Sequence, residues 1–154
     1  MIQELIRSSV VVEALESADK AAALNEVVSA LVGAGAVAEG MADEVGERAL
    51  AREARGSTGI GHGVAVPHAK VGGVGGMVMA LARSRSGIDY DAVDGQPVHT
   101  IFFLVSPEDQ ADDHLAALRW VSSLARDADF RRFVLAASGE AEVRELLLEM
   151  SESK

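Results

Sequence analysis

The stretch VHTIFFLV, residues 98–105, decides the fold, because it is almost continuous in apolar, β-branched and aromatic residues. Runs of this kind are typical of a strand that is covered on both faces. Three shorter apolar runs, at residues 10–12, 64–66 and 77–82, are also expected to be strands. Turn signals separate the later runs: the glycines of residues 72–76 and the pair Asp94-Gly95. We therefore expect a sheet in the middle of the chain.

Segments with helical spacing lie on both sides of this region. In the first, Leu24, Val27, Val28 and Leu31 form one stripe, and Asp19 is placed to cap its start. The expected helices are residues 19–33 and 41–55, a helix marked by Leu115, Leu118, Val121 and Leu124, and shorter helices at 130–137 and 140–150. Helices at both ends with strands between them predict an α/β layered domain. The length of 154 residues suits a single domain over residues 1–154.

Composition excludes several classes of function. The formal net charge of −10 argues against a nucleic-acid partner, because phosphate binding needs clustered lysine and arginine. The chain has no cysteine, which excludes disulfides, thiolate catalysis and cysteine-based zinc sites. No apolar run is long enough to insert into a membrane, and charged residues interrupt the N-terminal segment. We therefore expect a cytoplasmic protein.

The segment GIGHGVAVPHAK, residues 59–70, carries two histidines, His62 and His68, among glycines and a proline. Its glycines do not have the GxGxxG spacing and no GK[ST] follows, so a nucleotide loop is not predicted. In an extended chain the two histidines would point to one face, as in a metal site. Asp112, Asp113 and His114 are further candidate ligands, but no established ligand spacing is present, so we expect no metal.

The histidines leave several interpretations open. Pro67 stiffens the chain before His68 and would hold its imidazole at the end of a strand, but a loop histidine without a role fits equally well. His114 is near a helix start, which favours a neutral ring. His99 enters the strongest strand, and we interpret it as structural. Ser57 and Ser106 lie outside any GxSxG elbow, which argues against serine catalysis.

Three blocks of sequence, in order, resemble one known family. They are STGIGHGVAVPHAK at residues 57–70 with Arg52-Glu53 just upstream, GIDYDAVDGQPVHTIFFLVSPED at 87–109, and DDHLAALRWVSSLARD at 112–127. Together they resemble the enzyme IIA domains of the fructose–mannitol type, which belong to the bacterial phosphoenolpyruvate-dependent sugar phosphotransferase system. The resemblance covers nearly the whole chain and implies a mixed β-sheet flanked by helices.

The resemblance also implies a function and a set of site residues. In that family the histidine of the Pro-His pair accepts a phosphoryl group, and it corresponds to His68. His114 and Arg52 correspond to residues beside the phosphoryl site, and Thr58 and His62 are expected at its periphery or in contact with a partner. The implied donor is the phosphocarrier HPr, the implied acceptor is an enzyme IIB domain, and no metal or other cofactor is needed.

The same resemblance includes a second branch, in which a nitrogen-regulatory protein signals to target proteins through its phosphorylation state. The motif does not separate uptake from regulation, and a histidine metal-binding protein is a weaker alternative. The chain departs from the family at His62, where other members often carry Glu, Asn or another polar residue. Because glycines flank His62, we expect its side chain to face solvent.

Overall fold

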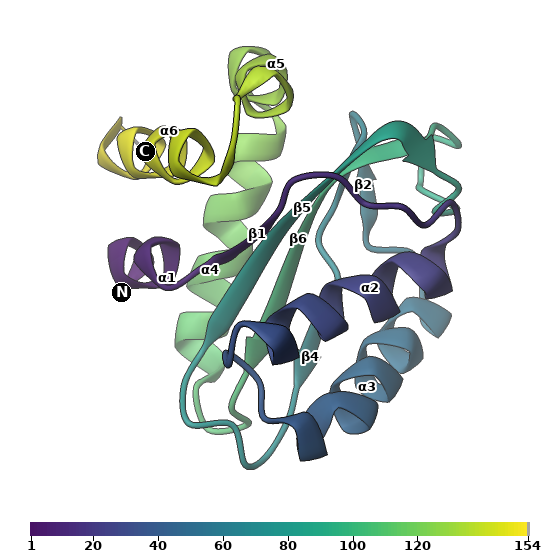
Figure 1. Ribbon diagram of the computed structural model, residues 1–154, viewed down its shortest axis with the longest axis vertical. Helices are drawn as coiled ribbons and strands as arrows, with labels where there is room; N and C mark the ends of the chain where they lie inside the picture. The colour runs from purple at the N-terminus through teal and green to yellow at the C-terminus, as the bar shows by residue number, and fades with distance from the viewer. Residues whose placement is uncertain (154) are drawn as a thin grey trace.

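The computed structural model describes residues 1–153, which form a mixed β-sheet between two layers of helices (Figure 1). The strands follow the order β1-β5-β6-β3-β2, and β4 also pairs with β6. Their bounds are β1 Val10–Val12, β2 Gly59–Gly61, β3 Val64–Ala65, β4 His68–Lys70, β5 Val78–Ile88 and β6 Val98–Ser106. The predicted α/β class and the implied mixed sheet are confirmed.

Strand β6, which contains the VHTIFFLV stretch, is the centre of the sheet. It is antiparallel to β5 on one side and parallel to both β3 and β4 on the other. Ile101, Phe103 and Val105 pack into one half of the core, whereas Phe102 and Leu104 pack into the other half. This alternation confirms that the strand is covered on both faces.

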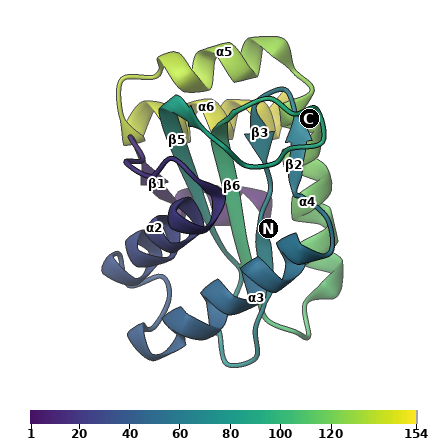
Figure 2. The same cartoon turned by 90° about the vertical axis from the view of Figure 1, so that its right-hand side faces the viewer.

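The helices divide between the two faces of the sheet (Figures 1 and 2). One face is covered by α2 (Lys20–Gly33) and α3 (Ala42–Ala54), and the short 3-10 helix η1 (Glu39–Met41) precedes α3. The other face is covered by α1 (Ile2–Arg7), α4 (Ala111–Ala125), α5 (Ala128–Ala136) and α6 (Glu140–Ser153). None of the helices in the described part of the chain is both long and apolar enough to cross a membrane.

Several local expectations are confirmed at the level of single contacts. The carboxylate of Asp19 caps α2 by accepting a hydrogen bond from the backbone N–H of Ala22 at 2.9 Å. Gly95 adopts a positive φ of 71° in the predicted Asp-Gly turn. The strand predicted at 77–82 is longer than expected, because its second half continues as the partner of the first residues of β6.

The helix predicted from Leu115, Leu118, Val121 and Leu124 is present as α4, but not all four residues lie on its buried face. Leu115 is 47% exposed, whereas His114 is only 4% exposed and lies on the buried face with Ala117 and Val121. The helix is therefore turned so that a histidine, rather than the leucine beside it, faces the sheet. Strands β2 and β4 and helix α1 were not predicted, because segments of three to six residues show no clear period.

Candidate active site

Two histidines from distant parts of the chain meet near the C-terminal end of β6. His68 is the first residue of β4 and pairs in register with Leu104 of β6, while His114 lies in the first turn of α4. Their ring centroids are 5.1 Å apart with an interplanar angle of 65°. The predicted pair His68 and His114 is therefore brought together in one site.

Pro67 separates two short strands that both pair with β6. The backbone N–H of Leu104 donates to the carbonyl of Pro67 at 3.0 Å, so Pro67 takes part in the pairing as an acceptor although it has no N–H to donate. His68 was expected at the end of a strand or in a loop. It instead begins β4, and its backbone is held by the ladder to β6.

His68 has one ring nitrogen bonded and the other available. Its Nδ1 lies 2.9 Å from the carbonyl oxygen of Val66, and because a carbonyl only accepts, Nδ1 must carry the hydrogen. Nε2 then holds the lone pair. Burial lowers the pKa of His68, Arg52 and Lys70 add to this effect, and the Val66 carbonyl and Glu53 oppose it. The ring is thus favoured as a neutral nucleophile.

His114 is more deeply buried than His68. Its Nδ1 lies 2.5 Å from the hydroxyl oxygen of Ser106, and its Nε2 is buried with no hydrogen-bond partner among the described residues. Burial, reinforced by His68 and Lys70, lowers the pKa of His114 to about 4. The ring is therefore neutral near pH 7, as expected, but burial rather than the start of the helix is the main cause.

Arg52 lies in the last turn of α3 and supplies a positive charge that acts on His68. Its Nη1 donates to the carbonyl of Gly56 at 2.8 Å, which fixes the side chain beside the segment leading into β2. No carboxylate pairs with this guanidinium among the described residues. Its remaining N–H groups are therefore free to bind an anion.

Thr58 belongs to a buried polar network rather than to the surface. Its backbone N–H donates to Glu53 at 3.1 Å, its hydroxyl also bonds the Glu53 carboxylate, and Tyr90 OH lies 2.9 Å from that hydroxyl. Lys20 pairs with Glu53 at 3.2 Å. Burial raises the pKa of Tyr90, so the phenol stays protonated. The network ties the end of α3 to the start of β2.

His62 is exposed at the tip of the β2–β3 hairpin and has a φ of 58°. His62 and Gly63, with φ values of 58° and 77°, reverse the chain, so the segment from His62 to His68 is not extended as a shared face would require. The exposed side chain of His62 confirms the expectation that it faces solvent. The backbone N–H of His62 donates to Asp94 at 3.2 Å. Within residues 1–153, no group of three or more His, Asp or Glu side chains is arranged to hold a metal ion.

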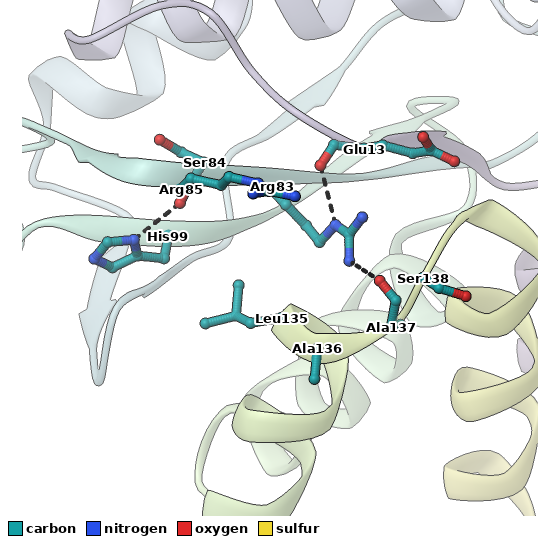
Figure 3. A pocket seen from close by; sticks show the side chains of 9 residues that line it. All are labelled: Glu13, Arg83, Ser84, Arg85, His99, Leu135, Ala136, Ala137 and Ser138. Carbon is teal, nitrogen blue, oxygen red and sulfur yellow. Dashed lines mark hydrogen bonds between the residues drawn. The ribbon is translucent and has the colours of Figure 1, made fainter.

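A hollow of about 470 Å³ lies at the other end of the sheet, between β5, the start of β6 and α5 (Figure 3). The guanidinium of Arg83 is already hydrogen-bonded there, since it donates to the carbonyls of Glu13 at 3.1 Å and Ala137 at 2.7 Å. The Nδ1 of His99 is 2.9 Å from the Ser84 carbonyl, which fits the structural interpretation of this histidine. The predicted site residues do not line this hollow.

Sequence reasoning missed the groups that orient the two histidines. The carbonyl of Val66 has no sequence signal, because any residue provides one. Ser106 does have one: it is a hydroxyl at the end of an apolar strand, on the same face as Phe102 and Leu104. A polar side chain in such a position needs a buried partner, and His114 is a buried polar residue that follows it closely in the sequence.

Solved structures place the fold in a known class. The nitrogen regulatory protein IIA-Ntr from Neisseria meningitidis matches with a TM-score of 0.78 and 32% identity over 95% of this chain and 98% of that chain. The enzyme IIA-mannitol in its complex with phosphorylated IIB-mannitol from Escherichia coli matches with a TM-score of 0.72, 90% and 94% coverage, and 17% identity, which shows the fold alone. Both matched structures contain a IIA protein.

The family model described as "Phosphoenolpyruvate-dependent sugar phosphotransferase system, EIIA 2" matches residues 4–150, and the chain belongs to this family. It is 35% identical over 146 residues to the fructose-specific EIIABC component of Bacillus subtilis, covering 95% of this chain and 23% of that protein. It is also 35% identical to a nitrogen regulatory protein of Bradyrhizobium diazoefficiens, covering 92% and 90% of the two chains. The chain thus spans under a quarter of its fructose-specific relative.

Proposed function

We propose that this protein is a phosphoryl carrier in which His68 Nε2 accepts a phosphoryl group and later releases it to a second protein. The observation that carries the proposal is the hydrogen bond from His68 Nδ1 to the Val66 carbonyl. That bond fixes the tautomer and leaves the Nε2 lone pair as the nucleophile. Membership of the EIIA 2 family supports this chemistry.

The transfer is a displacement at phosphorus. The Nε2 lone pair of His68 forms the new N–P bond, the N–P bond of the donor phosphohistidine breaks, and its electron pair returns to the donor ring. His68 keeps the Nδ1 hydrogen, so the phosphorylated ring gains positive charge. The Val66 carbonyl stabilises that charge through its hydrogen bond, and the Glu53 carboxylate, which already favours a charged His68, acts in the same direction.

In this proposal, two groups would stabilise the phosphoryl oxygens. Arg52 contributes a fixed positive charge beside His68, and its guanidinium is held by the Gly56 carbonyl. His114 contributes a neutral ring next to His68, with an Nε2 that lacks a partner among the described residues. Preorganised donors of this kind are effective because they do not reorganise during the reaction.

The family supports two uses of the same chemistry. In uptake, phospho-HPr would donate to His68 and an enzyme IIB would receive the group. In regulation, the phosphorylated and free forms would bind target proteins differently. The nitrogen regulatory protein of Bradyrhizobium diazoefficiens, which matches over 90% of its length, supports regulation as a second candidate function.

The test is labelling of the full chain with phosphoenolpyruvate, enzyme I and HPr. We expect acid-labile phosphate on His68, found by mass spectrometry, and no label in His68→Ala. His99→Ala is the matched control, because it removes a half-buried histidine at the far end of β6 and should leave labelling intact. Label that persists in His68→Ala, or an unlabelled wild type with a competent donor, would refute the proposal.

A further inference from the structure

Ser106 is the last residue of β6 and its side chain is completely buried. Its backbone carbonyl accepts a hydrogen bond from the backbone N–H of Val71 at 2.9 Å, and Ser106 pairs in register with Lys70 of β4. Its hydroxyl oxygen lies 2.5 Å from Nδ1 of His114. Backbone pairing therefore fixes this serine, and the hydroxyl has a single partner among the described residues.

The direction of this hydrogen bond follows from where each arrangement leaves its unmet donor. If His114 Nδ1–H donated to Ser106, the serine hydrogen would be buried without an acceptor, and the His114 Nε2 lone pair would be buried without a donor. If Ser106 donates, both Nδ1 and the hydroxyl hydrogen are satisfied. The serine oxygen as an acceptor and the Nε2–H of His114 then lack partners, so each arrangement leaves one donor and one acceptor unmet. The arrangements differ in where the unmet donor lies: an Nε2–H on the ring beside His68 can be met by an arriving anion, whereas a hydrogen on the completely buried Ser106 side chain cannot.

The two arrangements have opposite effects on a phosphoryl group at His68. An Nε2–H on the neighbouring ring, 5.1 Å away between centroids, is a donor for anionic phosphoryl oxygens. An Nε2 lone pair would instead repel those oxygens. Because burial holds His114 neutral, protonation of the ring does not supply the missing hydrogen near pH 7. The tautomer of His114 therefore decides whether this ring stabilises or opposes the transfer.

We propose that Ser106 is a positioning residue: it donates its hydroxyl hydrogen to His114 Nδ1 and so holds the Nε2–H tautomer and the ring orientation needed beside His68. This inference rests on the proposed phosphoryl transfer for its consequence, but not for the hydrogen bond itself. Ser106 does not touch the reacting atoms. Its contribution passes through His114, whose unpaired Nε2–H is satisfied when the phosphoryl group arrives.

The direct test is the tautomer of His114 in the unphosphorylated wild type, read from the ¹⁵N chemical shifts of its imidazole at neutral pH. We expect a protonated Nε2 and an unprotonated, hydrogen-bonded Nδ1. In Ser106→Ala the Nδ1 signal should move to the position of an unbonded nitrogen, whereas Ser106→Thr, which keeps a hydroxyl, should restore it. A wild-type His114 with the hydrogen on Nδ1 would overturn the proposal.

The second test is the rate of phosphorylation by phosphoenolpyruvate, enzyme I and HPr. We expect Ser106→Ala to slow labelling on the order of 10-fold, less than the ~100-fold typical when an oxyanion donor is removed outright, because His114 itself remains. Ser84→Ala is the matched control, since it removes another buried serine hydroxyl, which accepts from Gly87 at 3.0 Å away from the site. Unchanged labelling in Ser106→Ala would refute the positioning role. An unlabelled wild type would refute the proposed function alone and leave the tautomer result valid.

Discussion

The burial of a neutral His114 predicts a specific loss of stability in acid. The pKa of this ring falls from 6.5 in the unfolded chain to about 4 in the folded protein. As the pH falls below the unfolded value, the unfolded chain takes up the proton first, so folding becomes less favourable. The stability contribution is therefore complete above the unfolded pKa and is lost progressively as the pH falls toward the folded pKa.

The size of the effect follows from those two pKa values. Between pH ~7.5 and pH ~5, proton uptake by the unfolded histidine lowers the free energy of unfolding by about 2 kcal/mol. His68 and Glu26, whose pKa values are also lowered, act in the same direction. A variant that lacks only the His114 ring retains their contribution. The difference between wild type and His114→Gln in the stability lost over this pH range therefore isolates the contribution of the His114 ring.

The assay is urea unfolding at both pH values, followed by circular dichroism and by the fluorescence of Trp120, which is the single tryptophan and lies on the same helix. Wild type should lose about 2 kcal/mol more than His114→Gln between the two pH values. The stability of the variant at neutral pH does not enter this comparison. Equal losses in the two proteins would show that His114 is not held neutral by burial, and would remove the basis for its role as a neutral donor.

Two further predictions concern the charge of Arg52 beside His68 and the tight packing of Gly59. Replacing Arg52 with alanine should slow labelling of His68 by about 10- to 100-fold, because a preorganised positive charge is lost, whereas Arg55→Ala on the exposed end of the same segment should have little effect in the same assay. Gly59→Ala should lower the free energy of unfolding by about 1–3 kcal/mol in urea titrations, since its new Cβ would lie 2.7 Å from the Cβ of Ala92, inside contact distance. Gly40→Ala, with nothing within 4 Å of the new Cβ, is the control and should be close to neutral; similar losses in the two glycine variants would refute the packing argument.

The parts of the fold that could be predicted are those whose signal lies within one segment. Helix α2 has four apolar residues on one stripe and an aspartate cap, and β6 is apolar over its whole length. Strand β4 could not be found in this way. Its three residues follow a proline, and they form a strand only because β6 offers free backbone groups beside them. Pairing of that kind is a property of the folded chain rather than of the local sequence.

The site divides in the same manner. Residue chemistry alone did not decide whether His68 and His114 have a functional role. The resemblance to a family predicted that they share a site, and the structure brings their rings together. The expectation that His62 faces solvent is confirmed, but the chain reversal at His62 and Gly63 was not predicted, because sequence period carries no information about such a reversal. The buried position of Ser106 has a signal in the sequence, but its pairing with His114 does not, since the two meet only after α4 has turned back over the sheet.

Strand β6 fixes the positions of both histidine rings relative to each other. His68 is set by backbone pairing with Leu104, and His114 contacts the side chain of Ser106, two residues further along the same strand. The glycine-rich segment 71–77 and the 89–97 loop lie outside strands β4 and β6 and helix α4, which carry these contacts. Insertions and substitutions in those loops can accumulate during evolution without changing the separation of the rings, whereas losing one residue inside β6 would turn its side chains to the opposite face. The two loops are therefore free to diverge faster than the strand that sets the positions of the two rings.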